Sequence, residues 1–308
     1  MSNVAFIFPG QGAQFVGMGK SVYDASEKAR AVFDAASTVL GYDCAALCFN
    51  GPEEKLTETK FSQPAIFTTS MAVLAVLKEH CPALVPAAVL GLSLGEYTAL
   101  VAAGVLTFEE GILLVKKRAE AMDEVAREAG GSMASVIGSS YDVCKETTEA
   151  VGDVWVANLN SPQQIVISGT AAGVEKAMAQ LKEKGVKRVI PLKVSGAFHS
   201  PLMMPARTQL NDAVQQVVFK GPATVFVPNV TAEPEPDAEK IKGYLLEQLT
   251  GTVQWSRSFE KIISRGITEF LEIGPGTVLK GLARKISSDA VVTSLHTYEE
   301  IVAYAQGQ

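Results

Sequence analysis

The segment Gly91-Leu92-Ser93-Leu94-Gly95 holds the residues that could most directly do chemistry. The apolar run at 87–90 has the pattern of a buried strand, and small helix-forming residues follow up to Ala103. A sharp strand-to-helix turn strains its central serine and lifts the hydroxyl clear of the sheet. Flanking glycines give the room that such a turn needs. Ser93 is therefore a candidate nucleophile; the alternative is a passive serine in an ordinary buried turn.

A histidine is the usual proton acceptor for such a serine, and the chain has three histidines. His80 falls at the end of an expected helix, and His296 lies near the C-terminus. His199 follows the candidate nucleophile and lies in a loop, where Ser200 and Pro201 can begin the next helix. A histidine in such a loop is as often a hydrogen-bonded structural residue as a general base, so both interpretations stay open.

Arg118 flanks the apolar stripe of a helix expected over 107–128. Spacing alone favours a surface arginine whose stem covers apolar side chains while its charge reaches water. The alternative is a guanidinium at the rim of an apolar pocket. There it could bind a carboxylate through two parallel hydrogen bonds.

A hydrolase with a Ser-His-acid triad on an α/β sheet would carry its acid between the serine and the histidine. The aspartates in that interval, at 123, 142 and 153, do not follow an obvious strand. We therefore expect a Ser-His dyad. A dyad suits an activated thioester, because its good leaving group needs less help than an amide.

The elements that must position these residues alternate between strand and helix. Strands are expected at 4–8, 224–230, 270–273 and 291–295, with helices at 21–39, 64–79, 107–128, 237–249, 256–265 and 277–286. This alternation predicts a large α/β-hydrolase-like domain, formed by residues 1–127 and 197–308, with a mostly parallel sheet covered on both faces. Residues 53–60 read as a solvated surface segment. The glycines after the first strand do not match the dinucleotide-binding spacing.

Between the two halves of this domain the expected order of strands and helices changes. Residues 128–196 read as strand, helix, strand, strand, helix, strand. This order is typical of a ferredoxin-like unit, so we expect a small α+β domain inserted in the larger one.

Composition narrows the class of protein further. The chain has 308 residues, 47% hydrophobic and 19% charged, with a net charge of −6, which argues against general nucleic-acid binding. No apolar run approaches the ~20 residues that span a bilayer, and no signal peptide is evident. The four cysteines form no C-x-x-C pair and the histidines have no metal-ligand spacing. We therefore expect a cytoplasmic protein with reduced thiols, no bound metal and no membrane partner.

Eight stretches, in order over nearly the whole chain, resemble the malonyl-CoA:acyl carrier protein transacylases of bacterial fatty-acid synthesis and lipid metabolism. They are FPGQGAQ (8–14), SQPAIF (62–67), GLSLGEYTAL (91–100), the helix of Arg118, NLNSPQQIVISG (158–169), VSGAFHSPLM (194–203), EQLTGTVQW (247–255) and EIGPGTVL (272–279).

The resemblance implies a role for several positions. Ser93 would be the nucleophile and His199 its general base and then acid, with an oxyanion hole from the backbone amides of Gln11 and Leu94. Arg118 would bind the malonyl carboxylate.

Three further residues would shape the same site. The backbone carbonyl of Gln248 would orient the histidine ring, Gln63 would line the pocket, and Phe198 would leave no room for an α-methyl group. One departure is Leu92, where the family often has histidine. We expect its side chain to point away from the reacting centre and to alter packing, not activity.

The implied reaction is transfer of malonyl from malonyl-CoA to the phosphopantetheine thiol of acyl carrier protein through a malonyl-serine, in two half-reactions. No tightly bound cofactor is expected, since coenzyme A and the phosphopantetheine arm are substrates, and the enzyme should be a monomer. The carrier would dock on basic residues, for which the candidates are Lys187, Arg188, Arg207, Lys280, Arg284 and Lys285. The alternatives are a serine esterase or thioesterase, and a non-catalytic module that binds the carrier protein.

Overall fold

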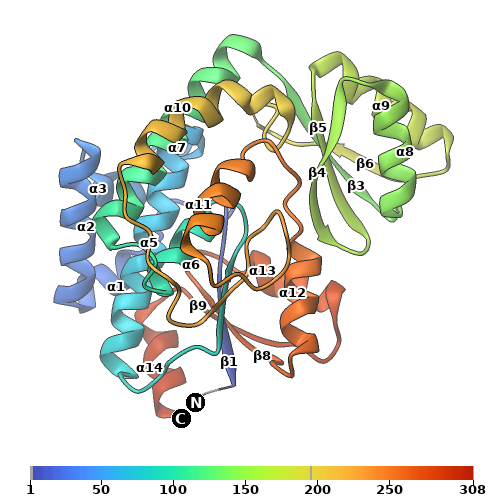
Figure 1. The fold of residues 1–308 in the computed structure, drawn as a ribbon. Coiled ribbons are helices and arrows are strands. Elements are labelled where there is room, and N and C mark those ends of the chain that lie inside the picture. Colours follow the sequence, from blue (N-terminus) through green and yellow to red (C-terminus); the bar gives the residue numbers. More distant parts are fainter. Residues whose placement is uncertain (1–2, 195, 308) are drawn as a thin grey trace.

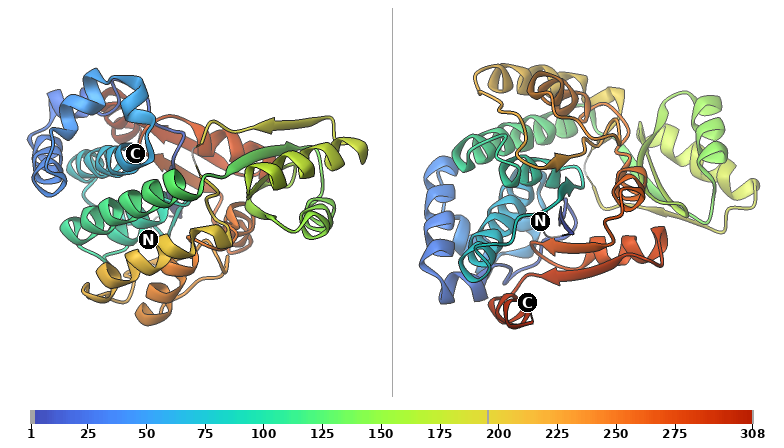
Figure 2. Two further views of the ribbon diagram at one scale, coloured as in Figure 1. Left: turned by 90° about the horizontal axis from the view of Figure 1, so that it is seen from above. Right: turned by 60° about the horizontal axis from the view of Figure 1, so that its bottom comes forward.

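The computed structural model describes residues 3–194 and 196–307, and it contains two separate sheets (Figure 1). Ser195, in the stretch expected to return the chain to the large domain, lies outside the described residues. Helices pack around the larger sheet, and the smaller sheet projects to one side of it in both views of Figure 2. The molecule is thus a mixed α/β protein with two structural units.

The larger sheet is parallel at every pairing, with the order β7-β2-β1-β8-β9. Its strands are β1 (Val4–Phe8), β2 (Ala88–Gly91), β7 (Val225–Phe226), β8 (Glu269–Ile273) and β9 (Val291–Leu295). The strand expected at 224–230 is wrong in length, because only two residues pair with β2. Pro228 has no N–H to donate and disfavours regular continuation, and Asn229 turns instead toward the loop that carries Ser93.

Alternating side chains of β1 show that both faces of this sheet are buried. Val4, Phe6 and Phe8 join one apolar cluster with residues of α2 (Glu27–Leu40), α5 (Thr59–His80) and α7 (Phe108–Ala129). Ala5 and Ile7 join a second cluster with residues of α12 (Trp255–Ser264) and α13 (Val278–Ile286). The other helices of this unit are α1 (Lys20–Ala25), α3 (Cys44–Asn50), α4 (Glu53–Thr57), α6 (Gly95–Ala102), the 3₁₀ turn η1 (Pro201–Met203), α10 (Met204–Gln215), α11 (Ala238–Glu247) and α14 (Tyr298–Gln306). The expected two-sided cover is confirmed.

Two details of the helices differ from expectation. Residues 53–57 form the short helix α4, and α5 begins at Thr59, so that Pro64 lies inside the helix and not in its first turn. Burial of the segment from Ser62 to Ser70 outweighs the backbone hydrogen bond that Pro64 cannot make. Among the described residues no single helix is long and apolar enough to cross a membrane; only the pair α2 and α3, bent by 112°, passes such a test together.

The smaller sheet is antiparallel throughout, with the order β4-β5-β3-β6. Its elements are β3 (Ser132–Ile137), α8 (Tyr141–Val151), β4 (Val154–Ser161), β5 (Gln164–Gly169), α9 (Ala171–Glu183) and β6 (Arg188–Pro191). An irregularity in β4 between Val156 and Asn158 frees backbone groups for the larger unit. The Leu159 amide donates to the Val253 carbonyl at 2.8 Å, and the Val253 amide donates to the Ala157 carbonyl at 2.8 Å. These bonds hold β4 against the segment before α12.

Candidate active site

Ser93 occupies the bend between β2 and α6, with φ of 52°. Space around this bend is set by its two glycines. A Cβ on Gly91 would lie 1.9 Å from the backbone of Gly95, and one on Gly95 would lie 2.1 Å from the carbonyl oxygen of Phe8 in β1. The strained turn that the glycine spacing predicts is therefore present, and neither glycine can carry a side chain without a backbone shift.

Replacing Gly95 with alanine should destabilise the fold by several kcal/mol, at or beyond the upper end of the ~1–3 kcal/mol seen for overpacking. The reason is that the new methyl group meets backbone and not a flexible side chain. Gly281→Ala is the matched control, since that position lies in α13 with nothing within 4 Å of an added Cβ. The control should stabilise by about 0.5–1 kcal/mol. Urea unfolding of both variants measures the difference, and equal midpoints would contradict the crowding.

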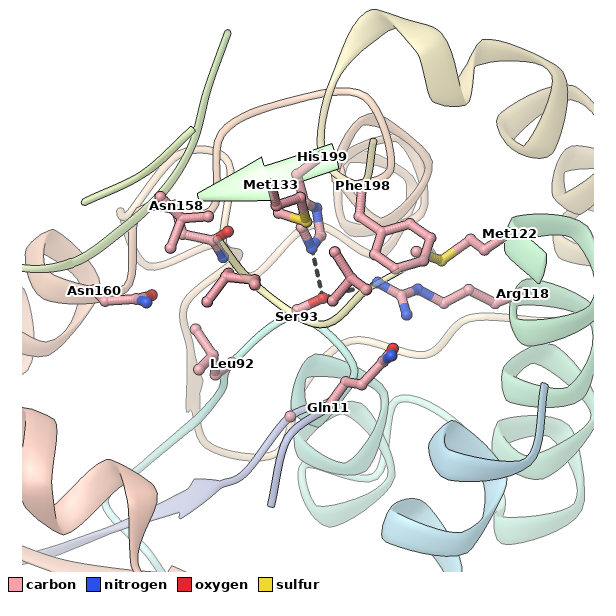
Figure 3. Close-up of a pocket in the computed structure, with 14 residues that line it drawn as sticks. Gln11, Leu92, Ser93, Arg118, Met122, Met133, Asn158, Asn160, Phe198 and His199 are labelled. Atoms are coloured by element: carbon pink, nitrogen blue, oxygen red, sulfur yellow. Dashed lines mark hydrogen bonds between the residues drawn. The ribbon is translucent and has the colours of Figure 1, made fainter. Parts of the chain in front are cut away.

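His199 lies directly against the serine (Figure 3). Its Nε2 is 2.7 Å from Ser93 Oγ, and its Nδ1 is 2.7 Å from the backbone carbonyl oxygen of Gln248. A carbonyl can only accept, so Nδ1 carries the proton and Nε2 is left to accept from the serine. Burial, followed by the positive charge of Arg118, lowers the pKa of His199 to about 4, against the raising effect of the Gln248 carbonyl. The ring is thus neutral at pH 7 and able to take a proton.

The pH dependence of Ser93 modification should report this lowered pKa. A depressed histidine pKa means that the neutral, base-competent form persists until the pH falls through about 4. The rate of inactivation by phenylmethylsulfonyl fluoride, a neutral serine reagent, should therefore be flat from pH 7 to about 5 and fall below that. A midpoint near the ordinary histidine value of about 6.5 would show instead that the ring is not held in this buried environment.

Arg118 is 1% exposed, so the surface position that its spacing favours is wrong. Its helix α7 packs between α5 and α10, and these contacts bury the side chain. Nη1 donates to Gln63 Oε1 at 2.6 Å, while Nη2 donates to Ser93 Oγ and to Gln248 Oε1, both at 2.9 Å. Within residues 3–194 and 196–307 no carboxylate forms an ion pair with it. A buried guanidinium held by neutral oxygens is ready to bind an anion.

A cavity of about 160 Å³ opens in front of Ser93 between the two units. Its walls come from loops of the larger unit, from α7 and from the smaller unit, and are formed by Gly10, Gln11, Leu92, Ser93, Arg118, Met122, Met133, Asn158, Asn160, Val166, Leu192, Val194, Phe198 and His199. Gln63, expected to line this pocket, is not among these residues and instead contacts Arg118 and Gln11. The expectation that Leu92 points away from the reacting centre is wrong, because Leu92 lines this cavity. Figure 3 shows its side chain on the side of Ser93 away from Arg118.

The two expected oxyanion-hole residues both lie close to the serine. Gln11 is in the loop after β1 and lines the cavity, and Leu94 immediately precedes α6. Among the described residues, neither backbone amide donates to a backbone or side-chain acceptor. Free amides beside a helix N-terminus can stabilise negative charge on oxygen.

A model of the acyl transferase domain matches residues 5–298. This chain belongs to the acyl transferase family. It is 45% identical over 291 residues to the malonyl CoA-acyl carrier protein transacylase of Bacillus subtilis, covering 93% of this chain and 91% of that protein. The structure of the malonyl CoA-acyl carrier protein transacylase from Coxiella burnetii matches with a TM-score of 0.95 at 35% identity, over 98% of this chain and 96% of that one. A malonyl-transacylase solved in complex with its type II polyketide synthase acyl carrier protein has a TM-score of 0.95 at 37% identity and full coverage of both chains.

Sequence reasoning missed two polar residues of this acyltransferase. Asn229 Oδ1 accepts from the Ser93 amide at 2.7 Å, and its Nδ2 donates to the Gly91 carbonyl at 2.7 Å, so one side chain fastens both sides of the bend. Glu96 is fully buried directly behind the serine. A signal for Glu96 existed, since it is a lone acid in an otherwise uncharged helix, whereas nothing local distinguishes Asn229.

The basic residues expected to dock a carrier lie on both units of the acyltransferase. Lys187 and Arg188 are exposed at β6, and Arg284 and Lys285 are exposed at the end of α13. Lys285 donates to Gln164 Oε1 at 3.1 Å and so links the two units. Lys280 and Arg207 are half-buried. Their part in docking stays a prediction.

Proposed function

We propose that the chain transfers the malonyl group of malonyl-CoA to the phosphopantetheine thiol of acyl carrier protein through an ester on Ser93. The observation that carries the proposal is one hydroxyl within 2.7 Å of a neutral imidazole and 2.9 Å of a buried guanidinium. The first pair activates oxygen as a nucleophile, and the second recognises a carboxylate at the other end of a short acyl group. The relatives, which are named malonyl CoA-acyl carrier protein transacylases, support the same function.

In the first half-reaction His199 Nε2 takes the proton of Ser93 as Oγ attacks the thioester carbonyl carbon. The backbone amides of Gln11 and Leu94 stabilise the oxyanion that forms. The carbon–sulfur bond then breaks, and the imidazolium returns its proton to the sulfur of coenzyme A. Malonyl stays on Ser93 as an ester, its carboxylate bound to Arg118, while Phe198 limits space beside the α-carbon.

In the second half-reaction the carrier's thiol enters the emptied cavity. His199 takes the thiol proton, sulfur attacks the ester carbonyl, and the ring returns the proton to Ser93 Oγ as the carbon–oxygen bond breaks. Throughout both steps the Gln248 carbonyl keeps the proton on Nδ1, so that Nε2 serves as both base and acid. No cofactor has to remain bound between the steps.

We place the enzyme in the cytoplasm as a monomer, with no cofactor held between turnovers. We assign residues 1–127 and 197–308 to an α/β-hydrolase-like catalytic domain, supported by its parallel sheet. We assign residues 128–196 to an inserted ferredoxin-like domain, supported by its chain order and by the sheet order β4-β5-β3-β6.

Intact-protein mass spectrometry tests the function. After incubation with an equal mixture of malonyl-, acetyl- and methylmalonyl-CoA, the protein should gain one malonyl group, and Ser93→Ala should gain none. The adduct should persist for minutes and disappear when carrier protein with its phosphopantetheine arm is added. Rapid loss to water would favour a thioesterase. Carrier binding without any adduct would favour a non-catalytic module.

A further inference from the structure

Behind the reacting groups lies a buried carboxylate that the reaction as written does not use. Glu96 is fully buried in the first turn of α6, three residues after Ser93. Its Oε2 accepts from Gln248 Nε2 at 2.7 Å and from the Asn229 amide at 3.1 Å, while Oε1 has no partner among the described residues. Burying a carboxyl group is costly, so its retention here calls for a function.

The side chain of Gln248 connects this carboxyl group to the site. Its Nε2 faces three oxygen atoms, Glu96 Oε2 at 2.7 Å, the Ser93 carbonyl at 3.0 Å and Asn229 Oδ1 at 3.4 Å. With Nε2 turned that way, Oε1 must face Arg118, whose Nη2 donates to it at 2.9 Å. A flipped amide would place an N–H group against the guanidinium and an oxygen against the carboxyl group.

Gln248 also serves the histidine through its main chain, because its carbonyl oxygen accepts from His199 Nδ1. One residue therefore aligns the proton acceptor with its backbone and the carboxylate-binding cation with its side chain. The shortest of the three contacts that fix its side-chain amide is the one to Glu96.

We propose that Glu96 is a positioning residue for acyl selection, which acts through Gln248 to aim Arg118 at the carboxylate of the bound acyl group. This inference rests on the proposed function. What the role requires is an oxygen acceptor at the position of Oε2, not a negative charge. Burial raises the pKa of Glu96 to about 7, and Oε2 remains an acceptor when the proton is on the unpartnered Oε1. Gln248 therefore keeps its orientation toward Arg118 in either protonation state of Glu96.

Two conservative variants separate acceptor from charge. Glu96→Gln keeps the reach and the acceptor but removes the charge; Glu96→Asp keeps the charge but withdraws the oxygen by one methylene. Glu96→Asp should lower kcat/KM for malonyl transfer by about 10²-fold, as expected for a displacement of about 1 Å in a positioned group. It should also lower the malonyl-to-acetyl ratio by about tenfold. Glu96→Gln should stay within about threefold of the parent enzyme in both, because its hydrogen bonds are conserved.

Glu272→Asp is the matched control. Glu272 is also fully buried, but it accepts from the amides of Leu279 and Lys280 and from Ser294, none of which lines the cavity. Its variant should lower the melting temperature without changing the malonyl-to-acetyl ratio. A ratio that falls equally in both aspartate variants would reduce the effect to general loss of stability and overturn the proposal.

Gln248→Met completes the test, because it removes the side-chain amide and keeps the backbone carbonyl. If Glu96 acts through that amide, the double variant with Glu96→Asp should select no worse than Gln248→Met alone. If Glu96→Asp does not fold, Gln248→Met alone still tests the inference. That variant should form the adduct on Ser93 but with a lower malonyl-to-acetyl ratio. Three results would each overturn the inference. The losses of malonyl selection in the two single variants could add in the double variant, or Gln248→Met could leave the malonyl-to-acetyl ratio unchanged. The third is a larger defect in Glu96→Gln than in Glu96→Asp. If the parent enzyme forms no malonyl adduct, the proposed function itself fails, which is a separate result.

Discussion

His199→Ala should acylate Ser93 from malonyl-CoA about 10²–10⁴-fold more slowly than the parent enzyme at neutral pH, the range typical of a lost general base. The structure explains why no other described residue can substitute. The imidazole nitrogen is 2.7 Å from Ser93 Oγ, and among the described residues the other side-chain contact to that oxygen is the donor Arg118, which cannot accept a proton. Rapid-quench mass spectrometry of the malonyl adduct measures the rate.

His80→Ala is the control for this experiment. His80 is an exposed histidine at the end of α5, where its ring contacts Tyr298 edge-on at 5.4 Å. That variant should retain the full acylation rate. Retention of the full rate in His199→Ala would move the base elsewhere and with it the proposed chemistry.

Arg118→Ala should reduce malonyl transfer by about 10²–10³-fold and acetyl transfer far less, because a buried carboxylate left without a partner costs a few kcal/mol. The acetyl group carries no carboxylate and loses no such partner. Steady-state kcat/KM for the two thioesters measures the change in preference. Equal losses would place Arg118 outside the substrate's contacts.

Two further measurements test whether the change in preference comes from the guanidinium of Arg118 and its charge. Arg118→Lys retains the positive charge but not the planar fork, so its malonyl preference should fall between those of arginine and alanine. The positive charge of Arg118 also lowers the pKa of His199, so in Arg118→Ala the midpoint of Ser93 modification should move to higher pH. An unmoved midpoint would show that the two groups do not interact through charge.

Several structural features were predictable because they depend on neighbours in sequence. The turn at Ser93 follows from an apolar run, two glycines and a helix-forming segment, and the sterics at Gly91 and Gly95 are local. The five-residue strand β1, with its side chains buried on both faces, follows from its uniform apolar character. The expectation failed where packing overrode local preference, as at Pro64, which lies inside a buried helix.

Arg118 shows the limit of such reasoning most clearly. Spacing on α7 cannot distinguish a stem that lies along an apolar surface from a side chain covered by another helix. In the structure α5 and α10 pack against α7, and the side chain of Arg118 is buried. Gln63 was expected in the pocket wall, and in the structure it instead accepts a hydrogen bond from the guanidinium of Arg118. Both differences arise because burial is a property of the assembled helices.

The sequence by itself determined the serine bend, the alternation that makes a covered parallel sheet, and the family to which the chain belongs. Only the tertiary structure decided which groups meet. Ser93 and His199 are separated by 106 residues, and Ser93 and Gln248 by 155, yet the first two are 2.7 Å apart and the second pair 3.0 Å. Distances of that kind are set by the order of strands in the sheet and by the segment that ties β4 to the larger unit. No local pattern encodes them, because the physical forces that bring the groups together act between elements and not along the chain.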